Sequence, residues 1–193
     1  MKMISKRARQ KPTWSDATSE REVRAWGVIV PTLTIAALTL VITLPWGFDP
    51  RLVHVPPLLI LALVFCWTVR RSRLVPAVLV FGVGIAVDVV TASPVGFWAF
   101  LFLVGYALAA QIARLIGPKP LIGALLGFPP VSVFVAGLGY AIQSGYFARL
   151  APFEPLMASL KTAWIVFPII LLAVAFVDRR MTHKATPSAG DAV

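Results

Sequence analysis

The sequence has few of the side chains on which most enzymes depend. It contains one cysteine, two histidines and eight acidic residues in 193 positions, and only 13% of its residues are charged. Because Cys66 is the single cysteine, neither an internal disulfide nor a cluster of thiolate metal ligands can form. A glycine-rich phosphate loop and a helical His/Glu metal spacing are also missing. We therefore expect no catalytic residues, no bound metal and no cofactor.

Apolar residues, in contrast, are abundant. They make up 59% of the chain, and the mean hydropathy is +0.85. A soluble domain of this length has too little interior to bury so many apolar side chains. The sequence predicts an all-α polytopic membrane protein, with a transmembrane domain at residues 25–178 between flexible cytoplasmic tails at 1–24 and 179–193.

The apolar runs divide the transmembrane domain into a bundle of six helices. A helix needs about 20 apolar residues to cross the hydrocarbon core of a bilayer. Between the third and fourth runs, Pro94 disfavours helix in the residue before it and predicts a tight turn. The expected spans are roughly 25–45, 54–69, 74–91, 95–115, 121–143 and 157–177.

The positive charges predict the orientation of these spans. With six helices, every Lys and Arg falls on the side of the N-terminus except Arg51, Arg149 and Lys161. The positive-inside rule therefore predicts that both termini are cytoplasmic. The net charge of +10 then reflects topology and not affinity for nucleic acid, and no nucleic-acid partner is expected. The basic residues within 2–11 favour attraction to anionic membrane lipids, with docking of a protein partner as the alternative.

Asp88 is the leading candidate for a site, because it is the only acidic residue well inside an expected span. Small residues such as Gly84, one turn earlier, allow another helix to approach it closely. One interpretation is a satisfied polar contact that fixes helix register; the other is a proton site, a ligand site or a partner contact. Four residues expected at the same membrane level are possible partners of Asp88: Trp98, Tyr140, Gln143 and Lys161.

Two adjacent prolines interrupt the fifth expected span. Pro129 and Pro130 each lack the backbone N–H that a helix interior needs. Water cannot repair such a defect inside a bilayer, so we expect a kink or a break near the middle of this helix. Broken helices line substrate sites in some transporters, whereas a kink alone is a packing feature.

Residues 56–108 resemble the family of the bacterial rod shape-determining protein MreD. The resemblance rests on Trp67 before a basic loop, Gly84 and Asp88 four residues apart, a turn containing Pro94 and Gly96, and an aromatic-bearing helix with Tyr106. These six residues are the motif positions that the resemblance implies. It gives them no catalytic role.

The resemblance implies a non-enzymatic scaffold of the cell-wall elongation machinery that maintains rod shape, located in the bacterial inner membrane. Its implied partners are the bitopic protein MreC, the actin homologue MreB, and a wall glycosyltransferase and transpeptidase. Members of the family also resemble the substrate-binding subunits of energy-coupling-factor vitamin transporters, which is the alternative function. An intramembrane enzyme is the third hypothesis, and it would need convergent catalytic groups that this sequence lacks.

Overall fold

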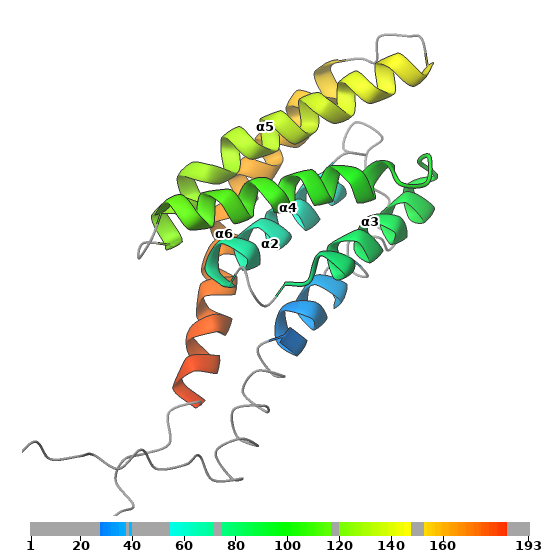
Figure 1. Cartoon of the computed structure of the whole chain (residues 1–193). Helices are drawn as coiled ribbons and strands as arrows, with labels where there is room; N and C mark the ends of the chain where they lie inside the picture. The colour runs from blue at the N-terminus through cyan, green and yellow to red at the C-terminus, as the bar shows by residue number, and fades with distance from the viewer. Residues whose placement is uncertain are drawn as a thin grey trace, which may run out of the picture.

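The computed structural model describes residues 28–37, 39, 55–71, 75–116, 120–147 and 153–184 (Figure 1). In these parts of the chain all regular structure is helical, and no strand occurs. The helices are the segment Val28–Ala37, α2 (Val55–Arg71), α3 (Ala77–Thr91), α4 (Phe97–Ile116), α5 (Pro120–Phe147) and α6 (Phe153–Lys184).

Each expected span overlaps one of these helices, although residues 25–27, 38 and 40–45 of the first span lie outside the described residues. The all-helical prediction is confirmed for the described residues. Three stretches are long and apolar enough to cross a membrane, namely Phe97–Leu115, Leu121–Tyr146 and Phe153–Arg180. The segment Val28–Ala37 and α3 are apolar but shorter. The fold therefore has the composition of a membrane protein, while the six-span topology with cytoplasmic termini remains a prediction.

Helices α5 and α6 are longer than the sequence predicted. Helix α6 continues through residues 179–184, which we had assigned to the C-terminal tail. The extension contains no proline or glycine, and its basic residues are favoured near a helix C-terminus. Residues 1–24 and 185–193, the remainder of the two expected tails, lie outside the described residues.

Of the two outcomes expected at the paired prolines of α5, a kink or a break, the break does not occur, because the helix is continuous through Pro129 and Pro130. Its neighbour provides polar support at this point. The Ser132 hydroxyl donates to the carbonyl of Pro129 at 2.8 Å, and Trp164 Nε1 of α6 donates to the Ser132 Oγ at 2.9 Å. Side-chain hydroxyls and adjacent helices commonly stabilise prolines inside membrane helices in this way.

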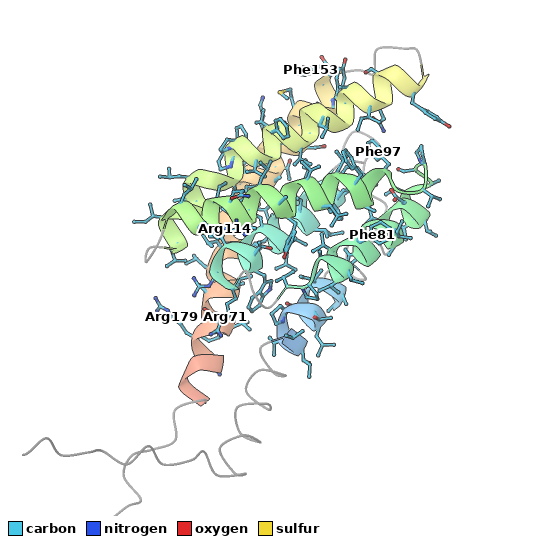
Figure 2. All side chains as sticks on the ribbon, viewed as in Figure 1. Arg71, Phe81, Phe97, Arg114, Phe153 and Arg179 are labelled. Atoms are coloured by element: carbon cyan, nitrogen blue, oxygen red, sulfur yellow. The ribbon has the colours of Figure 1, made fainter. Side chains whose placement is uncertain are left out.

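The described helices run alternately up and down, so their ends gather at two opposite ends of the bundle (Figure 1). At one end lies the short α3–α4 turn, together with the start of α6; we call it the turn end. At the other end, α2 ends beside α6, and α4 also terminates. Arg71, Arg114 and Arg179 lie there, opposite Phe97 and Phe153 (Figure 2), and we call it the arginine end.

Helix α2 forms the centre of the bundle. Every residue from Ile60 to Val69 is buried, so the helix is covered on all its sides. A helix that is apolar all round is expected in such a position. The Phe65 ring meets the rings of Phe128 on α5 and Phe167 on α6 at centroid distances of 5.6 and 6.3 Å. Helix α3 lies at the periphery and packs against α4.

Candidate functional site

The site is centred on Asp88, in the last turn of α3. Its side chain is fully buried, with 0% exposure. Asp88 Oδ2 accepts the backbone N–H of Gly96 at 2.8 Å, and Oδ1 accepts the backbone N–H of Trp98 at 2.7 Å. Within the described residues these two bonds are the only ones to the carboxylate; Gly96 immediately precedes α4, and Trp98 lies in its first turn.

The local sequence bends the chain so that α4 begins beside Asp88. Helix α3 ends at Ala92, which adopts the left-handed conformation with φ 50°. The N–H groups of Ala92 and Ser93 both donate to the carbonyl oxygen of Asp88. Gly96 then has φ 96°, a conformation that L side chains rarely adopt, and α4 starts at the next residue. The turn therefore brings the first amides of α4 back to the carboxylate that precedes it.

This arrangement makes Asp88 the N-terminal cap of the neighbouring helix. The first N–H groups of any helix lack partners within that helix, and they favour negative charge through the helix dipole. Capping residues normally belong to the helix that they cap. Here the cap comes from α3. One carboxylate therefore accepts backbone N–H groups at the start of α4 and also joins the two helices. Each carboxylate oxygen accepts a backbone N–H, which supports the structural interpretation of the buried acid.

Gly84 lies one helical turn before Asp88 on the same face of α3. A Cβ atom at this position would collide with the backbone of Ala99, 2.6 Å from its nitrogen and even closer to its Cα. Only glycine permits α3 and α4 to approach so closely at this crossing. The four-residue spacing therefore places two residues on the surface that contacts α4: Gly84, where no side chain fits, and Asp88, which accepts the hydrogen bonds.

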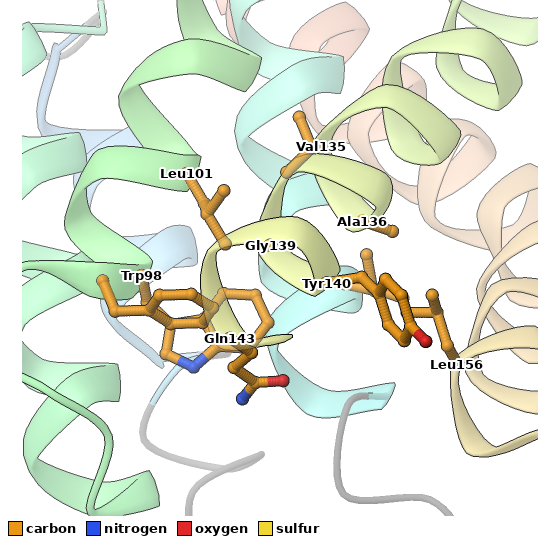
Figure 3. A pocket seen from close by; sticks show the side chains of 10 residues that line it. Trp98, Leu101, Val135, Ala136, Gly139, Tyr140, Gln143 and Leu156 are labelled. Carbon is orange, nitrogen blue, oxygen red and sulfur yellow. The ribbon is translucent and has the colours of Figure 1, made fainter. Parts of the chain in front are cut away.

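The predicted partners of Asp88 are placed differently from the expectation. Trp98 contacts the carboxylate through its backbone and not through its indole. Tyr140 and Gln143 of α5 do not bond to Asp88; they line a small cavity at the turn end with Trp98 (Figure 3). Lys161 is exposed on α6, which packs against α2 and α5 rather than α3. Placement by membrane level alone could not identify the helix that α3 contacts.

Two cavities near the Asp88 site are small. The one lined by Trp98, Tyr140 and Gln143 has a volume of about 40 Å³, and a groove beside it, between α4 and α5, has about 230 Å³. Sites for vitamin-sized ligands usually have volumes of about 300–1,000 Å³. Neither of these two cavities reaches that range.

The remaining motif residues lie around the same hairpin or behind it. Tyr106 of α4 donates its hydroxyl to the carbonyl of Val75 at 3.0 Å, just before α3 begins. The hairpin is therefore fastened at both ends of α3. Pro94 is exposed in the turn. Trp67 is fully buried in α2, and its Nε1 has no hydrogen-bond partner among the described residues.

Sequence analysis missed a second buried acid, Asp178, near the arginine end of α6. Arg70 donates to its Oδ2 through Nε at 3.2 Å and Nη2 at 2.6 Å, and Arg71 donates to its Oδ1 through Nε at 2.6 Å. These bonds fasten the end of α2 to α6. The sequence does contain a signal for this site, because Asp178 is an isolated acid at the basic end of the last span. Its partners Arg71 and Arg70, however, are 107 and 108 residues away along the chain.

The described residues contain no group of three or more His, Cys, Asp or Glu side chains that could hold a metal ion. In comparisons with known proteins, a model of the rod shape-determining protein MreD family matches residues 21–179. This range includes the Asp88 site and both partners of the Asp178 ion pairs. No curated protein and no solved structure matches the chain.

Proposed function

The chain belongs to the family of rod shape-determining protein MreD, and on that basis we propose that it is a non-enzymatic scaffold of the cell-wall elongation machinery. In this proposal it resides in the bacterial inner membrane. It acts there with a bitopic MreC-like protein, an MreB-like actin homologue, and a wall glycosyltransferase and transpeptidase. Its task is to hold membrane partners in a defined arrangement, and this requires a rigid surface and no chemistry.

The observation that supports a scaffold most strongly is the double fastening of α3 to α4. Asp88 caps α4 from α3, and Gly84 allows the two backbones to meet. Both of the most distinctive residues of the motif thus serve to fix one helix hairpin. A protein that positions others benefits from such preorganisation, because less conformational freedom is lost when the partner binds.

Among the described residues, the outer face of α3 is open. Nothing in the described chain lies within 4 Å of a Cβ built at Gly82. Helices associate in membranes mainly through close packing, for which small residues are favourable. We propose that the transmembrane helix of the bitopic partner lies along this face. Its exposed apolar residues are Val78, Phe81, Val89 and Val90.

The proposed topology has six spans with both termini in the cytoplasm. Lys161 is the one basic residue near the turn end whose side chain is described, whereas the arginine end has five. This imbalance supports a cytoplasmic arginine end under the positive-inside rule. The five arginines are Arg70, Arg71, Arg114, Arg179 and Arg180.

A pair of leucine substitutions tests the proposed partner surface. Gly82→Leu places a bulky side chain on the open face of α3, where it meets nothing of the described chain. Gly137→Leu does the same on the open face of α5 and is the matched control. Each variant, tagged, replaces the native protein in cells. The readouts are thermal stability in detergent, co-purification of the MreC-like protein and cell width.

We expect Gly82→Leu to keep normal stability and to lose most of the co-purifying partner, with wider cells. Gly137→Leu should retain both the partner and the normal width. Equal partner yield from the two variants would refute α3 as the docking surface. If native complexes contain paired ATPases and a coupling membrane subunit instead of wall proteins, the scaffold proposal itself is wrong.

A further inference from the structure

The arginine end has a buried carboxylate that is shared by two guanidinium groups. Asp178 lies between Arg70 and Arg71, and the side chains of Arg70 and Asp178 are 9% and 13% exposed. The Arg71 side chain is more accessible, at 30%. Two positive charges therefore face one negative charge, and one positive charge of this trio is not balanced within it.

The unbalanced charge is best assigned to Arg71. Arg70 makes two bonds to Asp178, through Nε and Nη2, whereas Arg71 uses Nε only. Among the residues that the structure describes, neither Nη group of Arg71 has a hydrogen-bond partner. An arginine held through Nε keeps its two outer N–H groups in one plane, in the geometry that binds two oxygens of a phosphate.

The surroundings that the structure describes do not supply the missing anion. Arg114, Arg179 and Arg180 are exposed at the same end of the bundle, where Arg71, Arg114 and Arg179 are labelled in Figure 2. Asp178 is the one acid at this end whose side chain the structure describes, since Asp88 and Glu154 belong to the turn end. The positive-inside rule accounts for the number of these charges but not for a buried carboxylate that orients two of them.

We propose that Arg71, oriented by Asp178, binds a phosphate group at the arginine end, either in an anionic lipid headgroup or as a free phosphate ion. The carboxylate fixes the guanidinium before the ligand arrives, so little side-chain freedom is lost on binding. A membrane interface supplies phosphodiesters at the level where the helices leave the hydrocarbon core. This inference depends on the membrane location of the protein and not on its proposed role in cell shape.

Native mass spectrometry of the full chain in a neutral detergent tests the site. The protein is titrated with phosphatidylglycerol, and the dissociation constant is compared with those of three variants. Arg71→Gln should weaken binding about tenfold, as expected for the loss of charge-assisted hydrogen bonds. Arg71→Lys keeps the charge but loses the planar pair of donors, and should weaken it severalfold. Arg114→Gln, the control, removes an exposed arginine at the same end and should stay within about twofold.

Two additional ligands identify the source of the phosphate. Competition by millimolar inorganic phosphate would indicate a free phosphate ion, and its failure to compete would indicate a lipid headgroup; both results support the site. A glucosyl diacylglycerol, which has no phosphate, should bind weakly. Equal losses in Arg71→Gln and Arg114→Gln, full affinity in Arg71→Lys, or tight binding of the glycolipid would each overturn the proposal. If Arg71→Gln fails to fold, Arg71→Lys decides the outcome.

Discussion

Replacing Asp88 with alanine removes the carboxylate that caps α4 and is the sharpest test of how the hairpin is held. The substitution leaves the N–H groups of Gly96 and Trp98 without their acceptors, at 2.8 and 2.7 Å in the native protein. The backbone bonds from Ala92 and Ser93 to the Asp88 carbonyl remain, because they do not involve its side chain. The loss is therefore confined to the polar contact between α3 and α4.

The expected cost follows from the two bonds and the burial of the carboxylate. A hydrogen bond to a charged group contributes about 1.5–3 kcal/mol, and an unsatisfied buried donor costs a similar amount. The favourable interaction of a negative charge with a helix N-terminus adds about 0.3–1 kcal/mol. Because Asp88 is 0% exposed, solvent cannot replace its oxygens directly. We expect Asp88→Ala to lower the free energy of unfolding by about 3–5 kcal/mol.

The assay is equilibrium unfolding of the purified protein in mixed micelles, followed by circular dichroism. Glu154→Ala is the matched control, since Glu154 is an exposed acid in the first turn of α6 at the same end of the bundle. The control should lose no more than about 1 kcal/mol. Asp88→Asn keeps one carbonyl acceptor but turns an amide donor toward a backbone donor. Its loss of unfolding free energy should fall between the losses of Asp88→Ala and Glu154→Ala. Equal losses in Asp88→Ala and Glu154→Ala would refute the capping role.

Two further predictions concern the other contacts that fasten the bundle. Gly84→Ala should reduce stability by at least about 2 kcal/mol in the same unfolding assay, because the added methyl collides with the α4 backbone. Gly82→Ala should cause no measurable loss, because the space around Gly82 is open. Equal stability of these two alanine variants would contradict the close crossing. Asp178→Asn removes the negative partner of Arg70, whose side chain is only 9% exposed, and should destabilise the protein by about 3 kcal/mol. The measurement is thermal unfolding in detergent. A change below about 1 kcal/mol would mean that this ion-pair cluster does not stabilise the fold.

Several features of the fold could be predicted because they depend on local sequence alone. Long apolar runs require burial, so the positions of the helices followed from composition, and Pro94 located the turn between the third and fourth spans. The helical repeat places residues four apart on one face, so Gly84 and Asp88 could be assigned to a single contact surface. Helix ends were less accurate, since nothing in the local sequence of α6 stops the helix at residue 178.

Other features depended on contacts between residues that are distant in the sequence. Membrane level made Tyr140, Gln143 and Lys161 reasonable partners for Asp88, but the left-handed Ala92 and the positive φ of Gly96 return the chain so tightly that the α4 backbone reaches the carboxylate first. Likewise, Asp178 forms ion pairs with Arg70 and Arg71, which are distant in the sequence, only because α6 packs against α2.

The sequence by itself determined that this is a helical, apolar protein with a deeply buried acid, because hydrophobicity and the helical repeat are properties of a single segment. The tertiary structure alone decided what that acid does. A buried carboxylate is stabilised by whichever donors lie within about 3 Å of its oxygens, and that short distance is set by the crossing of two helices and the shape of one turn. The capping of α4 by Asp88 is therefore a property of the assembled hairpin and not of the α3 sequence.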